Sequence, residues 1–73
     1  MNSLDSMPVG KKCKVKEISK NTSIKKRLLD MGVVPGVTVE IMGKAPLGDP
    51  IEVLLRGYKL TLRKEEAANI FVE

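Results

Sequence analysis

The chain lacks histidine and tryptophan, and among its 73 residues it has one cysteine, one tyrosine and one phenylalanine. Without histidine it lacks the usual general base and the most common metal ligand of proteins. A single cysteine forms no internal disulfide, so nothing in the sequence indicates an oxidising compartment. No apolar run approaches the ~20 residues that span a bilayer, and residues 1–9 lack the apolar core of a signal peptide. We therefore expect one cytoplasmic domain over residues 1–73, with the barrel described below spanning about 4–72.

Positive charge is concentrated in the first half of the chain. The formal net charge is +4, and residues 1–36 carry eight Lys and Arg against three Asp and Glu, whereas residues 37–73 carry five against six. Such a basic excess attracts nucleic acid, acidic protein surfaces or anionic lipid, and it is also typical of a solvated face. The residues that produce it are Lys11, Lys12, Lys14, Lys16, Lys20, Lys25, Lys26 and Arg27.

Alternation of apolar and polar residues predicts several short strands. Ile18 breaks the alternation of the first segment, which predicts a bulge or bend near Glu17. Arg56 and Gly57 separate two alternating segments, and this predicts a two-residue hairpin turn in which Gly57 adopts a positive φ. The segments are residues 12–18, 37–41, 51–55 and 58–62, and a final short strand is expected over 70–72.

One segment has helical periodicity instead. The spacing i, i+4, i+7 predicts an amphipathic helix over residues 23–31, and its apolar residues are Ile24, Leu28 and Met31. Gly32 is expected as the left-handed residue after this helix, with Val33 packed against Leu28 in a Schellman-type contact. A second helical turn is expected over residues 64–68, ended by Asn69 in the left-handed region.

These elements predict a mainly β fold, namely a small closed or nearly closed barrel of about five strands with one helix inserted after the first. The strands are joined by local connections, which disfavours a parallel α/β sheet. Because aromatic residues are scarce, we expect aliphatic side chains and methionine to fill the core. Tyr58 shares a face with Leu60 and Leu62, so we expect Tyr58 in the core.

No catalytic motif is found, so we expect that the protein is not an enzyme. The serines have no histidine to activate them, and the chain contains neither a nucleophile elbow nor a P-loop. Glu65 and Glu66 are adjacent carboxylates in the second helical turn. Since neighbouring residues of a helix point in different directions, we expect both to be exposed to solvent.

Metal ligands are also few. Cys13 is the only thiol, no second Cys or His completes a tetrahedral site, and its place on an alternating strand predicts a small buried residue. Asp49 and Glu52 offer at most a weak oxygen site, and Asp49-Pro50 is more typical of a turn. We therefore expect no catalytic site, no cofactor and no dedicated metal site, and leave open a weak or adventitious divalent metal.

Three functions are compatible with the sequence: a protein-interaction module, a nucleic-acid-binding barrel and a weak metal carrier or sensor. A nucleic-acid-binding barrel would use the basic half, but single-strand readers stack bases on aromatic side chains, and here only Tyr58 and Phe71 are available. No nucleic acid is therefore expected as a partner, and a weak metal carrier or sensor is the other alternative. A protein-interaction module would use the projecting segments 23–36 and 45–50, where Leu47 either presents an apolar contact or folds back as a plug of the barrel.

Several short motifs, in this order and spacing, resemble the FeoA family, the small cytoplasmic component of bacterial ferrous iron uptake. They are Gly10, then Arg27-Leu28-Leu29-Asp30-Met31-Gly32 with Pro35-Gly36, then Ala45-Pro46-Leu47-Gly48-Asp49-Pro50, Leu55-Arg56-Gly57, Leu62-Arg63 and Glu66-Ala67. The resemblance implies an SH3-like β-barrel with a helix inserted after the first strand. It extends to the C-terminal domain of iron-dependent repressors of the diphtheria-toxin-repressor type.

The resemblance also implies a function. FeoA-like proteins are expected to regulate, by protein–protein contact, the FeoB membrane permease, which carries a cytoplasmic GTP-binding domain. The chain would then act in the cytoplasm, where its partner would hold it at the inner face of the membrane without inserting it into the bilayer. The resemblance does not decide whether the chain forms a homo-oligomer. The residues expected at the partner surface are Lys25, Lys26, Arg27, Leu28, Leu47, Asp49 and Arg56.

Overall fold

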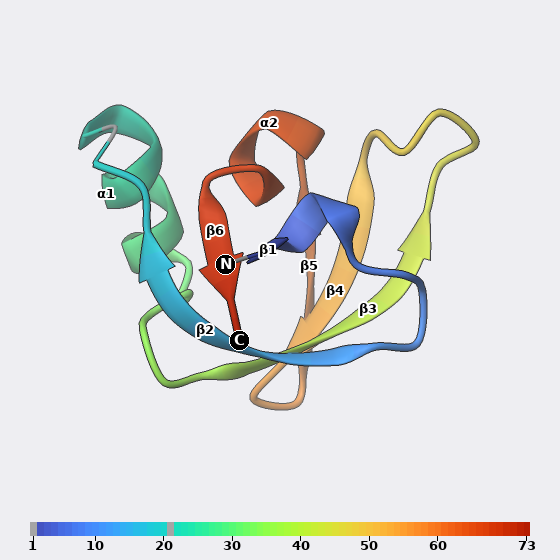
Figure 1. Ribbon diagram of the computed structural model, residues 1–73, viewed down its shortest axis with the longest axis horizontal. Helices are drawn as coiled ribbons and strands as arrows, with labels where there is room; N and C mark the ends of the chain where they lie inside the picture. Colours follow the sequence, from blue (N-terminus) through green and yellow to red (C-terminus); the bar gives the residue numbers. More distant parts are fainter. Residues whose placement is uncertain (1, 21) are drawn as a thin grey trace.

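The computed structural model describes residues 2–20 and 22–73, which form a mainly β structure (Figure 1). The strands are β1 (Asn2–Ser3), β2 (Lys12–Ile18), β3 (Thr38–Lys44), β4 (Ile51–Leu55), β5 (Tyr58–Leu62) and β6 (Ile70–Val72). The helices are the 3-10 turn η1 (Leu4–Ser6), α1 (Thr22–Asp30) and α2 (Lys64–Ala67). None of the helices so described is long and apolar enough to cross a membrane.

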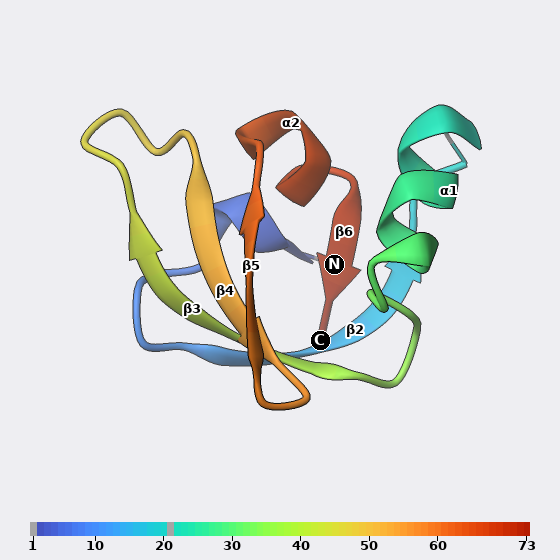
Figure 2. The same ribbon diagram turned by 180° about the vertical axis from the view of Figure 1, so that it is seen from behind.

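The strands form one antiparallel sheet in the order β1-β6-β2-β3-β4-β5. The sheet curls into a small barrel, with α2 over its upper end and α1 beside it (Figures 1 and 2). The predicted mainly β class and the helix inserted after the first long strand are confirmed. The two-residue β1 pairs with β6 and was not predicted, because two residues carry no periodicity.

Two irregularities bend the sheet. The register between β2 and β6 shifts between Val15 and Glu17, which confirms the bulge expected near Glu17. A second shift lies between Ile41 and Gly43 in the pairing of β3 with β4. Because a bulge adds a residue without ending the ladder, β3 continues to Lys44 instead of stopping where the alternation ends.

The core is aliphatic, as the scarcity of aromatic residues predicted. The expected share of methionine in it is wrong for the described residues, because Met7 and Met31 are only partly buried against the core and Met42 is 37% exposed. Each fully buried Val, Leu or Ile contributes roughly 1.5–3 kcal/mol relative to an exposed side chain. Cys13 is 2% exposed and lies in this core, as its strand position predicted. The largest fully buried side chains are Leu4, Leu28, Ile41, Ile51, Leu55, Leu62, Ile70, Val15, Val33, Val39, Val53 and Val72.

Helix α1 ends as the sequence predicted. Gly32 has a φ of +90°, the N–H of Val33 donates to the carbonyl of Leu28 at 2.9 Å, and the N–H of Gly32 donates to that of Leu29 at 3.0 Å. These two bonds define a Schellman motif. Leu28 and Val33 are both buried, so the end of the helix is fixed by apolar packing as well as by hydrogen bonds.

The end of α2 differs from the prediction. The left-handed conformation expected for Asn69 is wrong, because the helix closes at Ala68 with φ −65° and ψ −18° and Asn69 has no positive φ. Asn69 instead donates its side-chain Nδ2 to the carbonyl of Glu65 at 2.7 Å. This bond satisfies one of the last carbonyls of α2 without a left-handed residue.

Tyr58 lies at the surface, so its predicted place in the core is wrong. Its side chain is 42% exposed, and its hydroxyl donates to the carbonyl of Met31 at 2.8 Å. Its register partner Leu55 is buried in the core, but Tyr58 belongs to the edge strand β5, where no further strand of the described sheet covers its ring. A tyrosine hydroxyl requires a polar partner, and here the C-terminal end of α1 supplies it.

We predict that Gly32→Ala lowers the free energy of unfolding more than Gly36→Ala does. Both glycines have a positive φ, +90° and +95°, so alanine at either position costs about 1–2 kcal/mol of backbone strain. An added Cβ at Gly32 would also collide with the Tyr58 hydroxyl, whereas nothing lies within 4 Å of one at Gly36. Urea unfolding of the two variants measures the difference.

The Tyr58→Phe background separates the two contributions, because phenylalanine lacks the hydroxyl that the new Cβ would meet. In that background the cost of Gly32→Ala should approach the cost of Gly36→Ala. Equal costs of the two alanine variants with Tyr58 in place would contradict the close approach between Tyr58 and Gly32.

Candidate protein-interaction surface

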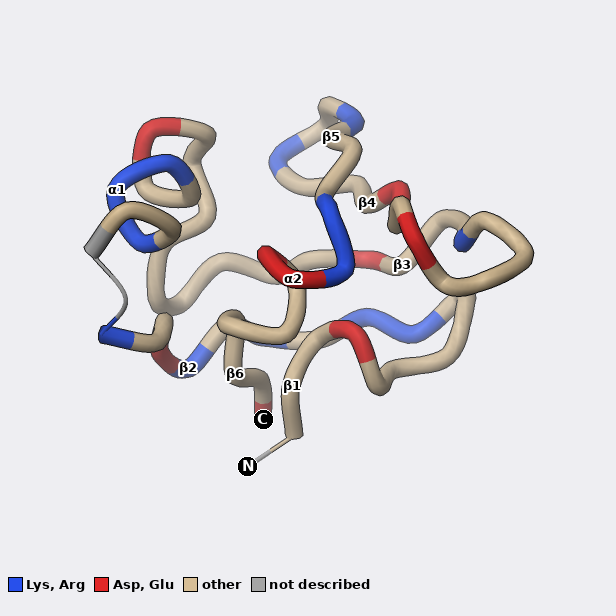
Figure 3. The backbone as a smooth tube through the Cα atoms, turned by 90° about the horizontal axis from the view of Figure 1, so that it is seen from above, with Lys and Arg blue, Asp and Glu red and all other residues tan. Residues whose placement is uncertain are grey.

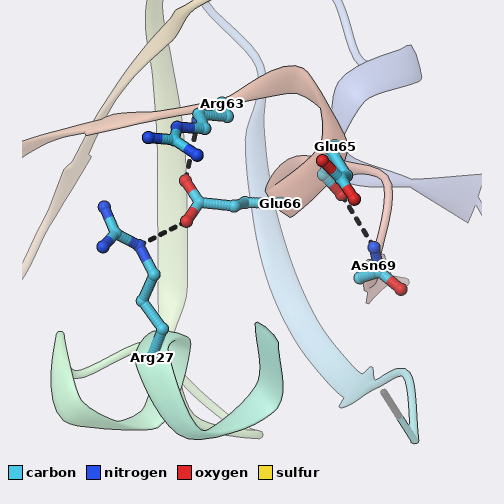
Figure 4. A network of polar contacts seen from close by, with 5 residues as sticks. All are labelled: Arg27, Arg63, Glu65, Glu66 and Asn69. Atoms are coloured by element: carbon cyan, nitrogen blue, oxygen red, sulfur yellow. Dashed lines mark hydrogen bonds and ion pairs between the residues drawn. The ribbon is translucent and has the colours of Figure 1, made fainter. Parts of the chain in front are cut away.

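Helix α2 is held at its start by a buried carboxylate. Oε1 of Glu66 accepts the backbone N–H of Arg63 at 2.8 Å, and Oε2 pairs with the Arg27 guanidinium of α1 (Figure 4). The Glu66 side chain is 6% exposed and that of Arg27 is 57% exposed. The expected exposure of Glu66 is therefore wrong: its carboxylate folds back to accept the N–H of Arg63, the residue that precedes α2, and Arg27 compensates the buried charge.

The 45–50 loop is closed by its own backbone. Gly48 donates to the carbonyl of Ala45 at 2.7 Å, and Ala45 donates to that of Pro50 at 3.0 Å. Asp49 Oδ1 accepts the backbone N–H of Lys64, the first residue of α2, at 3.0 Å. A carboxylate at this position satisfies a helix N–H that would otherwise lack a partner, so the loop is fixed to α2.

Leu47 stands at the tip of this closed loop and is 89% exposed. Of the two placements considered from the sequence, the structure has the exposed one, and Leu47 does not plug the barrel. Because the loop is already ordered by hydrogen bonds, little conformational entropy would be lost if a partner enclosed this side chain.

The predicted partner residues fall into three groups. Lys25, Lys26 and Arg27 are exposed on α1. Helix α1 lies with α2 and the 45–50 loop at the upper end of the molecule in Figure 1. Figure 3 looks down on this end and shows the cations of α1. Leu28 is 0% exposed and belongs to the core. Arg56 lies in the turn between β4 and β5, at the lower end in Figure 1.

Helix α2 connects the two parts of the upper end. It binds α1 through Arg27 and Glu66, and it binds the loop through the N–H of Lys64 and Asp49. Sequence reasoning found Arg27 and Asp49 but missed Glu66. The available signal was an acidic residue three positions after Arg63, the spacing of a capping box, although arginine is not a usual residue before a helix.

Over residues 2–20 and 22–73, no three His, Cys, Asp or Glu side chains gather in a group that could hold a metal ion. Asp49 is engaged with α2, and burial raises the pKa of the Cys13 thiol above its ordinary value, while Lys11 nearby lowers it by less. A thiol with a raised pKa is a poor nucleophile and a poor metal ligand. The described side chains therefore offer ionic, hydrogen-bonding and apolar contacts.

Solved structures share this fold. A FeoA-like protein from Clostridium acetobutylicum is 44% identical, with a TM-score of 0.93 over 99% of this chain and 84% of that one. A FeoA from Stenotrophomonas maltophilia, described as a prokaryotic SH3 domain protein and complexed with zinc, is 27% identical, with a TM-score of 0.87 over 100% of this chain and 91% of that one. A manganese-dependent transcriptional repressor shares the fold alone, at 17% identity and a TM-score of 0.91 over 97% of this chain and 35% of the repressor.

The fold is therefore that of a small SH3-like barrel. A family profile described as the FeoA domain matches residues 2–73, and the chain belongs to the FeoA domain family. A curated relative from Porphyromonas gingivalis, a fusion of Fe(2+) transport protein A with the Fe(2+) transporter FeoB, is 34% identical over 70 residues. Those residues are 96% of this chain and 8% of that relative, so the chain spans only a small part of the fusion protein.

We predict that Arg27→Met lowers the free energy of unfolding, because it leaves the buried Glu66 carboxylate without its cation. Removing one partner of a fully buried ion pair costs about 3–5 kcal/mol. Arg27 is 57% exposed and solvent screens the pair, so the expected loss is about 1 kcal/mol. Urea unfolding measures it, and Lys26→Met, which removes an exposed α1 cation without an ion pair in the described structure, is the matched control.

The double variant Arg27→Met with Glu66→Gln tests the pairing itself. Glutamine still accepts the N–H of Arg63 but carries no charge, so the double variant should be more stable than additivity of the two single changes predicts. Strictly additive losses would show that Arg27 and Glu66 do not interact in solution.

Proposed function

We propose that this chain is a non-catalytic accessory component of ferrous iron uptake that regulates a FeoB-type transporter by direct contact. The observation that carries the proposal is the Porphyromonas gingivalis relative, in which a segment 34% identical to 96% of this chain is fused to the transporter FeoB. In the fusion protein, the covalent connection keeps the two parts at the same place. Where the two parts are separate chains, binding between them must replace that connection. The chain would then lie at the inner face of the membrane through its partner.

The proposed contact is the upper end of the molecule, formed by the exposed cations of α1 and by the 45–50 loop. Lys25 and Lys26 would face acidic groups, and Leu47 would enter an apolar pocket of the partner. Interfaces commonly combine such an apolar anchor with charges at the rim. Leu28 is left out because it is buried, and Arg56 would belong to a separate contact at the other end.

Regulation by contact requires a difference in affinity. The barrel shifts the conformational balance of the transporter only to the extent that it binds one conformation better than another. A rigid, prearranged end suits this role, because it loses little entropy on binding and fits one arrangement of the partner's surface.

The two alternative functions have no comparable support. Phe71 is half-buried, so Tyr58, which is 42% exposed and held at its hydroxyl by α1, is the one exposed aromatic ring among the described residues. Single-strand readers instead stack successive bases on several rings. Zinc is present in the Stenotrophomonas maltophilia relative, but residues 2–20 and 22–73 of this chain bring no set of metal-ligating side chains together.

We predict that Lys25→Glu with Lys26→Glu, and separately Leu47→Ser, reduce retention of the detergent-solubilised FeoB transporter of the same organism at least about tenfold. The immobilised wild-type chain should retain the transporter. The matched control is Lys12→Glu with Lys16→Glu, which makes the same change of charge on exposed positions of β2 and should leave retention unchanged.

Equal losses from the α1 and β2 variants would indicate unspecific attraction between charges and contradict the proposed surface. Absence of retention by the wild-type chain, together with unchanged iron uptake in cells that lack it, would overturn the proposed function.

A further inference from the structure

Strand β5 has one unpaired side. It stands at the end of the sheet order and pairs with β4 alone. Because Leu55 and Tyr58 flank a two-residue turn, they form a hydrogen-bonded pair. The backbone N–H and C=O groups of every second residue of β5 therefore bond to β4, and those of the residues between them point away from β4. The outward backbone groups are those of Lys59 and Thr61, and across the described part of the chain no backbone partner takes them.

Apolar side chains stand on the inner side of this edge. Leu60 on β5 and Ile24 and Met31 on α1 are partly buried against the core, and Tyr58 is 42% exposed and bonded to Met31. A hollow lies between α1 and the junction of β5 with α2. It is lined by Ser23, Ile24, Arg27, Arg63, Glu65 and Glu66.

The charged residues of the edge segment itself (58–63) are both cations. Lys59 is exposed in the middle of it, Arg63 follows β5, and Lys26 lies on the facing helix. Arg27 is matched by Glu66, and the acidic groups further from the edge are Glu52 on β4, opposite Thr61, and Asp30 and Glu65, which line the α1 hollows. An extended segment with acidic side chains would therefore find complementary charge here.

We infer that the free edge of β5 pairs with an extended segment of a protein partner in which apolar and acidic residues alternate. Main-chain hydrogen bonds to Lys59 and Thr61 would hold the segment, as in other cases of strand addition to a sheet edge. Its apolar residues would face Leu60 and α1, and its acidic residues would lie beside Lys59 and Arg63. The inference deepens the proposed function, since it names how the chain would hold its partner.

A second copy of this chain fits the edge less well. Two β5 edges pairing with each other would bring Lys59 and Arg63 of both copies onto one short ladder, where like charges repel. A lysine on an edge strand is a common means of preventing such self-association. An acidic side chain of a partner segment would instead pair favourably with Lys59.

The edge is tested with a nine-residue peptide in which valine alternates with glutamate and threonine, titrated into the full ¹⁵N-labelled chain. We expect NMR shifts and slowed hydrogen exchange at the amides of Lys59 and Thr61. A control peptide of the same charge, with two valines replaced by proline, cannot form a strand and should bind at least tenfold more weakly.

Variants of the chain make the matched comparison. Thr61→Pro removes an outward N–H but no bond to β4, so it should weaken peptide binding at least tenfold, while Thr61→Ser should leave it unchanged. Lys59→Glu tests the charge without altering the backbone and should also weaken binding, which keeps the test decisive if the proline variant fails to fold.

The inference is overturned by any of three results: no response at Lys59 and Thr61, equal binding of the two peptides, or equal binding by Thr61→Pro and the wild type. Shifts at these amides that depend on the concentration of the chain alone would assign the edge to a second copy and would likewise overturn the acidic partner.

The FeoB transporter provides the second arm. Retention by the wild type with a tenfold loss in Thr61→Pro supports both the edge and the proposed function. Equal retention by the two overturns the edge inference and leaves the proposed function in place. Absence of retention by the wild type overturns the proposed function, and the peptide titration then decides on the edge by itself.

Discussion

The buried carboxylate of Glu66 is the interaction on which the upper end of the molecule depends. It accepts the backbone N–H of Arg63 at the start of α2 and pairs with Arg27 of α1. A nine-residue helix such as α1 does not persist alone in water, so it must be fixed from outside. Leu28 fixes it to the core, and Arg27 fixes it to α2.

The same helical turn also orders the 45–50 loop, because Lys64 donates its N–H to Asp49. One four-residue helix therefore holds two surface segments that are far apart in the sequence. In a chain of 73 residues, this arrangement holds together the end proposed as the contact surface, although the described part of the chain brings no set of metal ligands together. A small barrel of this kind can act on a larger protein by contact, and its precision depends on how well that end is held.

Much of the fold could be predicted from local patterns. Period-two alternation predicted the long strands, and the Gly32-Val33 pair after Leu28 predicted the Schellman end of α1, because these signals depend on neighbours in the sequence. The errors concern residues whose place is decided by distant partners. The buried carboxylate of Glu66 is paired with Arg27 from another helix. Tyr58 has strand periodicity but lies on the edge strand, where α1 supplies its hydrogen bond. For the candidate site, the motifs identified Arg27, Asp49 and Leu47, but they did not indicate that Arg56 lies at the opposite end or that α2 joins the others.

The central claim is that the Arg27–Glu66 pair keeps α1 in place on the barrel, and ¹⁵N relaxation of the backbone tests it most directly. In the wild type, the amides of residues 23–30 should have order parameters near 0.85, as in rigid backbone, and in Arg27→Met they should fall toward about 0.6. The amides of β3 and β4, which do not touch the pair, should keep their values in both proteins. Unchanged order parameters in α1 after loss of Arg27 would contradict the account.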